Sequence, residues 1–187
     1  MSNYFSDKEL TGFGFSKLGQ NVRISKSTCI HNCENIEIGD NVRIDNFCTI
    51  VLSDKAKLTI GNYVHISAYS FINGAADLDI GDFVTTAPFV RIFTSSDDYS
   101  GNFLTGGVVP RHLIGTISSK VIIEQHVIIG TGSTIMPGTI LRNGTAVGAH
   151  SFVRRSTNPL EIVAGIPAKR IGKRSDHIWD LEKWIYE

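Results

Sequence analysis

The chain has 187 residues and carries 18 basic and 18 acidic side chains, so its formal net charge at neutral pH is zero. That length suits one domain with a real core and leaves little room for a second. The neutral charge excludes the diffuse basic field that attracts nucleic acid or an acidic membrane surface, so any anion-binding site must be local.

The sequence also indicates where the protein resides. No apolar run approaches the roughly 18 residues of a membrane span, and no basic segment followed by an apolar one opens the chain. The three cysteines, Cys29, Cys33 and Cys48, lack the spacing of a zinc site, which is typical of free thiols in a reducing compartment. We expect a cytoplasmic protein with no metal and with no nucleic-acid or membrane partner.

Residues 1–16 predict a small helical cap. Ser6 and Glu9 have the spacing of a capping box, and Gly12 stands where the helix would end. Such a helix would cover the first coil of the repeat that follows, whose unpaired strand edges would otherwise template aggregation. A role in substrate contact is the alternative.

Residues 17–174 are dominated by a six-residue repeat. Its strictest stretch places a bulky aliphatic at every sixth position, at Ile123, Ile129, Ile135, Leu141, Val147 and Val153. A period of six fits neither an amphipathic helix nor a simple strand, but it suits a solenoid whose short strands form the sides of each coil. Glycine follows the aliphatic residue that restarts the register, where we expect tight corners that need a permissive backbone, at Gly19, Gly39, Gly61 and Gly81.

A second inward position accompanies each hexamer. Valine fills it at Val22, Val42, Val64, Val84 and Val127, and small residues such as Cys48 fill it on the other sides. One large and one small inward residue per hexamer would fill a narrow three-sided prism with three hexamers to a turn. The predicted fold class is therefore all-β, and Cys48 is predicted to be a buried filler without chemistry.

The register breaks after Ile92. Residues 93–120 form a long segment that is polar at its start and contains Gly106, Gly107 and Pro110. Closing such a loop costs entropy, so a loop of this length in a compact coil is either functional or disordered. Because regular coils flank it on both sides, we predict an active-site arm inserted into the repeat domain.

Residues 175–187 predict a closing helix. Ile178, Leu181 and Ile185 have helical spacing, and Ser175 is a plausible N-cap. We expect this helix to cover the last coil, with a subunit contact as the alternative.

The hexamers and the motif VAGIPAKRIGK that follows them resemble those of the left-handed β-helix acyltransferases, over residues 17–173. Within that hexapeptide-repeat superfamily, APFVRIFTSSDDYSG and IIGTGSTIMPGT are most similar to the galactoside and polysaccharide acetyltransferase branch, to which the sugar-nucleotide N-acetyltransferases are related. The resemblance implies a left-handed parallel β-helix, a homotrimer, and acetyl-CoA bound in clefts between neighbouring prisms.

The resemblance also implies which residues contact acetyl-CoA. Thr131 and Ala149, one coil apart, match small residues beside which the pantetheine arm lies. Arg154 and Arg155 match a threonine and basic pair, and Lys169 matches a basic residue at the nucleotide phosphates. Independently of the family, six cations within about twenty residues suit a 3′-phospho-ADP, with a solvated tail as the alternative: Arg154, Arg155, Lys169, Arg170, Lys173 and Arg174.

The expected catalytic positions depart from the galactoside branch. Asp97 stands where that branch has a histidine base, and Ser67 stands where an asparagine orients the acceptor. His65 matches a substrate-facing tyrosine, and its place in the register points it outward. A histidine can remove a proton at neutral pH, and Asp97 or Asp98 could orient it.

The predicted site thus has catalytic candidates in His65, Asp97 and Asp98 and substrate contacts in Ser67, Tyr99 and His112. For His65 the alternative is a surface histidine or a hydrogen bond at a subunit interface. For the two aspartates the alternative is Asx-turn capping of the loop.

The missing arm histidine favours an amine acceptor. A hydroxyl needs a strong base to attack a thioester, whereas an amine with a pKa of about 8 is partly nucleophilic at neutral pH. We therefore expect acetyl-CoA-dependent transfer to the amino group of a nucleotide-linked amino-deoxy sugar for surface polysaccharide such as O-antigen or capsule. O-acetylation of a galactoside or polysaccharide hydroxyl is one alternative. A non-catalytic β-helix that binds metabolites or scaffolds a complex is another.

Overall fold

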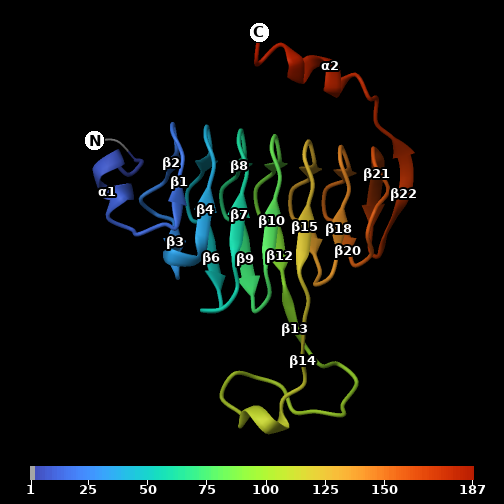
Figure 1. Ribbon diagram of the computed structural model, residues 1–187. Coiled ribbons are helices and arrows are strands. Elements are labelled where there is room, and N and C mark those ends of the chain that lie inside the picture. The colour runs from blue at the N-terminus through green and yellow to red at the C-terminus, as the bar shows by residue number, and fades with distance from the viewer. Residues whose placement is uncertain (1–2) are drawn as a thin grey trace.

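The computed structural model describes residues 3–187, so the first two residues of the predicted N-terminal cap lie outside the described residues. The chain winds into coils stacked along one axis, and each coil adds a short strand to each of three sheets (Figure 1). Neighbouring strands run parallel, and an antiparallel hairpin ends the second sheet. The predicted fold class, a left-handed parallel β-helix with a short helix at each end, is confirmed.

The three sheets form the sides of a prism. The first contains β1 (Lys17–Leu18), β4 (Ile36–Ile38), β7 (Leu58–Ile60), β10 (Leu78–Ile80), β15 (Val121–Ile123) and β18 (Ile140–Leu141). The second contains β2 (Arg23–Ile24), β5 (Arg43–Ile44), β8 (His65–Ile66), β11 (Thr85–Thr86), β16 (Ile128–Ile129), β19 (Ala146–Val147), β21 (Glu161–Gly165) and β22 (Ala168–Lys173). The third contains β3 (Cys29–Ile30), β6 (Thr49–Leu52), β9 (Phe71–Gly74), β12 (Arg91–Phe93), β17 (Thr134–Ile135) and β20 (Phe152–Val153).

The remaining elements are short. They are the helices α1 (Asp7–Thr11), η1 (Cys33–Asn35), η2 (Arg111–Leu113) and α2 (Ile178–Lys183), and the paired strands β13 (Ser95–Asp97) and β14 (Thr116–Ser118). Among residues 3–187, no helix has the length and apolar character needed to cross a membrane.

The core is a column of side chains from the predicted inward positions. The six repeat aliphatics of the stretch from Ile123 to Val153 are at most 3% exposed. The second inward position is also buried at Val22, Val42, Val64, Val84 and Val127, which confirms the register. Equivalent residues stack between coils, as Ile60, Ile80 and Ile123 do in the first sheet. Burial of apolar surface along this column is the main force that holds the coils together.

The recurring glycines allow close packing between coils. None of the four has a positive φ, and left-handed residues come two positions later, at Asn21, Asn41, Tyr63 and Phe83. A Cβ added to Gly39 would lie 2.7 Å from the carbonyl oxygen of Gly61 in the next coil. The prediction that these glycines provide a permissive backbone is therefore wrong, because it is the neighbouring coil that needs the space.

Cys48 is buried as predicted. Its side chain is 1% exposed, and its Sγ donates to the carbonyl oxygen of Ser67. Burial raises the pKa of the Cys48 thiol to about 11, since the apolar interior disfavours the thiolate. Cys29, in contrast, is exposed.

We expect Cys48 to resist thiol reagents in the folded protein while Cys29 reacts. With a pKa of about 11, only about one Cys48 thiol in a thousand is ionised at about pH 8. The core also keeps the reagent away from the sulfur. Labelling rates of two variants that each retain one cysteine, Cys29 or Cys48, measure the difference. Similar rates in the folded proteins would contradict the inward placement of Cys48.

The N-terminal helix α1 begins with the predicted capping box. The Ser6 hydroxyl accepts from the Glu9 N–H at 3.4 Å, and the Glu9 carboxylate accepts from the Ser6 N–H at 2.7 Å. Gly12 ends the helix as predicted. Leu10 is 2% exposed and packs into the core, so α1 covers the N-terminal end of the prism.

The C-terminal end differs from the prediction. β22 folds back on β21, and α2 lies along the side of the prism in Figure 1 instead of over the last coil. The prediction of Ser175 as N-cap is wrong, because α2 begins after His177 and the Ser175 hydroxyl accepts from the His177 N–H before the helix. α2 is held at the prism by His126, whose Nε2 is 2.7 Å from Glu182 Oε2 and whose ring packs edge-on against Trp179.

The predicted arm leaves the third sheet after β12 and returns before β15. β13 and β14 pair in antiparallel fashion, with Asp97 opposite Thr116, and carry the rest of the loop away from the prism (Figure 1). The short helix η2 lies in the distal part of the arm. The base of the arm, not its tip, therefore faces the third sheet.

Candidate active site

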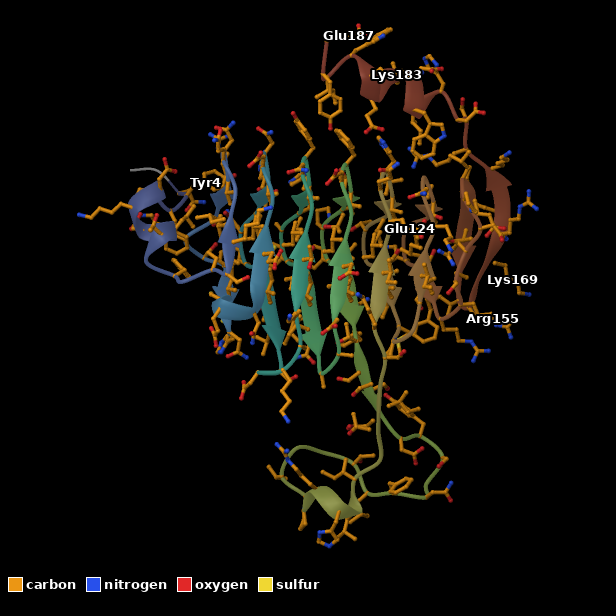
Figure 2. All side chains as sticks on the ribbon, viewed as in Figure 1. Tyr4, Glu124, Arg155, Lys169, Lys183 and Glu187 are labelled. Atoms are coloured by element: carbon orange, nitrogen blue, oxygen red, sulfur yellow. The ribbon has the colours of Figure 1, made fainter. Side chains whose placement is uncertain are left out.

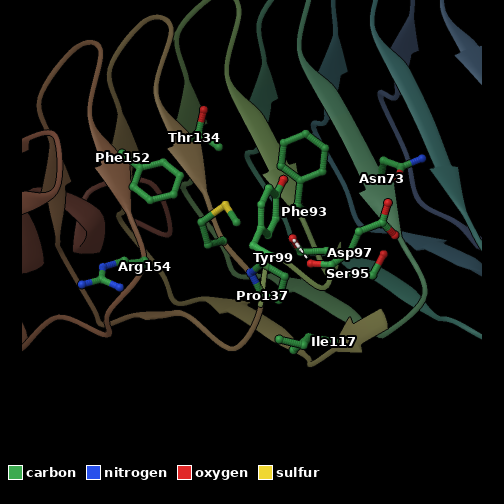
Figure 3. A pocket seen from close by; sticks show the side chains of 12 residues that line it. Asn73, Phe93, Ser95, Asp97, Tyr99, Ile117, Thr134, Pro137, Phe152 and Arg154 are labelled. Carbon is green, nitrogen blue, oxygen red and sulfur yellow. Dashed lines mark hydrogen bonds between the residues drawn. The ribbon is translucent and has the colours of Figure 1, made fainter. Parts of the chain in front are cut away.

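A cleft of about 950 Å³ lies between the base of the arm and the outer face of the third sheet (Figure 3). Its floor comes from β9, β12, β17, β20 and the residues that follow the last two strands. Its roof comes from β13, β14 and the turn after β13. The lining residues are Asn73, Phe93, Ser95, Ser96, Asp97, Tyr99, Ile117, Thr134, Met136, Pro137, Phe152 and Arg154.

The buried repeat residues orient the floor of the cleft. Successive side chains of a strand point to opposite faces, so the neighbour of an inward aliphatic points outward. Thr134 precedes the buried Ile135, and Phe152 precedes the buried Val153. The hexapeptide register therefore determines which side chains form the floor.

Asp97 and Tyr99 are the predicted catalytic or substrate-binding residues that the structure brings to the cleft. Asp97 is the acid among the lining residues, and Tyr99, which also lines the cleft, is 91% exposed. Arg154, expected at the CoA phosphates, also lines the cleft and is its cation. Carboxylate, phenol and guanidinium thus share one concave surface.

Asp98 is turned into the loop. Its Oδ2 accepts from the Ser100 hydroxyl at 2.8 Å and from the Ser100 N–H at 3.2 Å. The hydroxyl bond, followed by the backbone bonds of the turn, holds the pKa of the Asp98 carboxyl below its usual value despite slight desolvation. Asp98 does not line the cleft, so the Asx-turn alternative describes it.

The sequence did not predict nine of the lining residues as site residues. Four of them, Phe93, Ser95, Ser96 and Ile117, belong to the predicted arm, and the other five are Asn73, Thr134, Met136, Pro137 and Phe152. A signal for the two aromatic residues is present in the repeat, because both occupy outward positions where a solvated face would carry polar side chains. Together with Ile117, Met136 and Pro137 they form the apolar part of the cleft lining.

His65 lies on β8 in the second sheet and does not line the cleft. Its Nε2 is 2.8 Å from Asp45 Oδ2, and Arg43 Nε is 2.6 Å from Asp45 Oδ1. Asp45, rather than Asp97 or Asp98, is therefore the acid that orients His65. Asp45 stands 20 residues earlier, one coil away, where a search of neighbouring coils would have found it.

The Asp45 carboxylate is expected to stabilise the fold in a pH-dependent way. Burial by itself would raise the pKa of Asp45, but hydrogen bonds from His65 and Arg43 outweigh it and hold the pKa below its usual value. A lowered folded pKa means stability that is present above the unfolded pKa of about 3.9 and is lost as pH falls through the folded pKa. Asp45→Asn should therefore unfold about 1 kcal/mol more easily at neutral pH.

The measurement is urea unfolding of both proteins between neutral and acidic pH. The stability difference should narrow once the pH falls below the unfolded pKa of about 4. A difference that stays constant over this range would show that the charge of Asp45 contributes nothing.

Two further predicted residues lie away from the cleft. Ser67 is 8% exposed, its N–H donates to Thr86 Oγ1 at 3.1 Å, and its carbonyl oxygen accepts from the Ser70 hydroxyl at 2.7 Å. His112 is on η2, in the distal part of the arm. Neither Ser67 nor His112 is among the residues that line the cleft.

Thr131 and Ala149 occupy equivalent turns of adjacent coils. The Thr131 hydroxyl donates to the Pro88 carbonyl oxygen at 2.7 Å, which leaves only its methyl group for the surface. A Cβ added to Gly130 would lie 2.5 Å from the backbone nitrogen of Ala149, so the backbones of the two coils meet closely at this position. Thr134 and Phe152 of the cleft floor follow three residues after Thr131 and Ala149, so this turn leads directly into the cleft.

The basic residues of the C-terminal part have separate surroundings. Arg155 and Lys169 are exposed and project from the C-terminal end of the prism (Figure 2). Lys169, Arg170 and Lys173 belong to β22, and Arg170 Nε is 3.9 Å from Glu161 Oε1. Four of the six cations therefore remain exposed at or near this end of the prism.

Arg174 has a structural role instead of an anion-binding one. Its Nη1 donates to the carbonyl oxygens of His126 and Gly144, at 2.8 and 3.0 Å. Burial lowers the pKa of Arg174 from its usual value, as expected for a charge removed from water. The prediction that Arg174 belongs to the phosphate-binding cations is therefore wrong, because its guanidinium ties the C-terminal segment to two coils.

No protein-family model matches the chain. The chain is similar to the dTDP-4-amino-4,6-dideoxy-D-glucose acyltransferase of Escherichia coli, with 39% identity over 179 residues that cover 96% of this chain and 93% of the relative. A hexapeptide-repeat acetyltransferase from Vibrio cholerae, VCA0836, shares the fold at 23% identity and a TM-score of 0.59, over 90% of this chain and 80% of its own.

The chain is also similar in structure to AntD, an N-acyltransferase from Bacillus cereus. An AntD variant in complex with dTDP-4-amino-4,6-dideoxyglucose and coenzyme A has a TM-score of 0.94 and 39% identity, covering 100% of this chain and 98% of that one. AntD with dTDP and 3-hydroxybutyryl-CoA has a TM-score of 0.92 and 39% identity, covering 100% and 97%.

Proposed function

The chain belongs to the left-handed β-helix, hexapeptide-repeat acyltransferases related to the sugar N-acyltransferases, and on that premise we propose that it acetylates the C4 amino group of a dTDP-linked 4-amino-4,6-dideoxy sugar. The observation that carries the proposal is the cleft itself, whose lining combines one carboxylate, that of Asp97, with several apolar side chains and begins where the turn predicted to hold CoA ends. The donor is acetyl-CoA, and the product serves surface polysaccharide synthesis.

In the proposed reaction Asp97 is the general base. The sugar amine attacks the carbonyl carbon of the thioester, and Asp97 takes the proton that the nitrogen loses as the C–N bond forms. The C–S electron pair goes to the CoA sulfur as that bond breaks, and the proton then passes from Asp97 to the sulfur. The products are the amide and the free thiol.

The other proposed roles follow from the surroundings of each residue. Thr131 and Ala149 lie beside the pantetheine arm, and the CoA phosphates meet the exposed cations Arg155, Lys169, Arg170 and Lys173. Tyr99, which lines the cleft between Arg154 and Asp97, contacts the sugar. The proposed enzyme is a homotrimer in the cytoplasm. In such a trimer, His65, Ser67 and His112 would take part in the reaction only if a second subunit brought the substrate to them.

A thiol-release assay tests the proposal. Purified protein and acetyl-CoA are offered the dTDP-4-amino sugar, a neutral galactoside and no acceptor, and the product is identified by mass spectrometry. Release of CoA with an amide product only in the first mixture is the expected result. Release with the galactoside would favour O-acetylation, and no release with any acceptor would favour the non-catalytic alternative. A parallel reaction with 3-hydroxybutyryl-CoA identifies the preferred acyl group.

A further inference from the structure

We infer that Arg154 binds the diphosphate of the sugar nucleotide, and so belongs to the acceptor site rather than to the CoA site. The inference rests on the proposed function and deepens it. Figure 3 shows Arg154 on the far side of the cleft from Asp97, with Phe93 and Tyr99 between them.

The charges of the cleft support this assignment. Of the residues that line it, Arg154 carries the positive charge and Asp97 the negative one. Within residues 3–187, no hydrogen bond or ion pair engages the Arg154 guanidinium, and Asp97 is not its partner. A planar guanidinium can donate two parallel hydrogen bonds to phosphate oxygens, which an ammonium cannot do. The phosphate oxygens of a nucleoside diphosphate bound in this cleft would therefore accept hydrogen bonds from the Arg154 guanidinium.

The placement of the two charges on different strands suits a 4-amino sugar. The arm that carries Asp97 leaves β12, whereas Arg154 follows β20, and β17 lies between these strands. The strands from which the two residues extend, β12 and β20, are about 10 Å apart. In a 4-amino pyranose linked through C1, the amine and the diphosphate stand at opposite ends of the ring. A sugar nucleotide with its amine at Asp97 would thus direct its diphosphate toward Arg154.

The other basic residues are placed differently. Arg155 and Lys169 project from the C-terminal end of the prism in Figure 2, and neither lines the cleft. The reaction needs two anionic substrates, each with its own phosphates. Arg154 in the cleft is available to the sugar nucleotide, and the basic residues at the end of the prism are available to acetyl-CoA.

Calorimetric titration of the full-length protein with dTDP and, separately, with CoA tests the assignment. Arg154→Gln should weaken dTDP binding about tenfold or more, as expected for loss of a charge-assisted hydrogen bond, and leave CoA binding within about twofold. Arg155→Gln, its neighbour in sequence, is the matched control and should weaken CoA but not dTDP. Equal thermal unfolding of the variants and the natural chain confirms that both fold.

Steady-state kinetics give a second readout. For Arg154→Gln, the ratio of kcat/KM with the dTDP-4-amino sugar to kcat/KM with the methyl glycoside of the same amino sugar should fall about tenfold. Weaker CoA binding with unchanged dTDP binding in Arg154→Gln would overturn the assignment. So would an equal loss of dTDP binding in Arg155→Gln.

The assignment and the proposed function can fail separately. Loss of dTDP binding in Arg154→Gln supports the role of Arg154 even if the natural chain transfers no acetyl group. Normal acetyl transfer by the natural chain combined with unchanged dTDP binding in Arg154→Gln overturns the role of Arg154 and leaves the function standing.

Discussion

Asp97→Asn is expected to lower kcat for acetyl transfer at least about a hundredfold, the lower end of the usual contribution of a general base. The amide keeps the shape of the side chain but cannot accept the proton that the amine loses during attack. The KM for acetyl-CoA should stay within about twofold, because Asp97 acts on the proton and not on the CoA phosphates. Initial rates of thiol release over a range of acetyl-CoA concentrations, at a saturating concentration of the sugar nucleotide, measure both parameters.

Asp98→Asn is the matched control for this variant. Asp98 carries the same carboxylate one residue further on, but it accepts hydrogen bonds from Ser100 and lies outside the cleft. An amide oxygen can still accept those bonds, so kcat should change less than about threefold. If Asp98→Asn lost as much activity as Asp97→Asn, or if Asp97→Asn remained active, the assignment of Asp97 as base would fail.

Ile129→Ala is expected to destabilise the protein by about 2 to 5 kcal/mol, the range for truncating a buried isoleucine. Ile129 is 0% exposed and stacks between Thr86 and Val147 of the adjacent coils. Removing three carbon atoms from this column leaves a cavity that the rigid backbone of the coils can fill only in part. Equilibrium unfolding in urea measures the loss as a change in the midpoint at constant m.

Ile128→Ala on the same strand is the control. Ile128 is 44% exposed on the outer face of β16, so its truncation should cost less than about 1 kcal/mol. A shift of the register by one residue would exchange the two side chains between the faces of the sheet. Equal losses for the two variants, or a larger loss for Ile128→Ala, would therefore contradict the register.

The prism could be predicted because its determinants are local. Each coil repeats the same inward pair, so Val64 and Ile66 predict the same turn of backbone as Val84 and Thr86. Burial of these side chains confirms this. The sequence did not reveal why the glycines are needed. A side chain at Gly39 would clash with the backbone of Gly61, and this clash arises only because coils 22 residues apart are in contact. A period read along the chain does not measure the distance between coils.

The site was harder to predict because it is assembled from different coils. Asp97 could be identified from the arm, but Phe93, Met136 and Phe152 become its neighbours only through the folding of the arm over the third sheet. The partner of His65 is Asp45 on an adjacent coil, not an aspartate of the arm. The charge of Arg174 alone suggested a phosphate ligand, but its guanidinium donates hydrogen bonds to two backbone carbonyl oxygens.

The sequence by itself determined the β-helix, its inward register, the N-terminal cap and the position of the arm, because short-range patterns of side-chain size and polarity set which residues leave water. Only the tertiary structure decided which charges act together. Asp97 and Arg154 are 57 residues apart in the chain and line the same cleft. Asp97 and Asp98 are adjacent in the chain, but only Asp97 lines the cleft. Electrostatic interaction depends on distance through space and on exposure to water, and neither quantity is contained in the order of the residues.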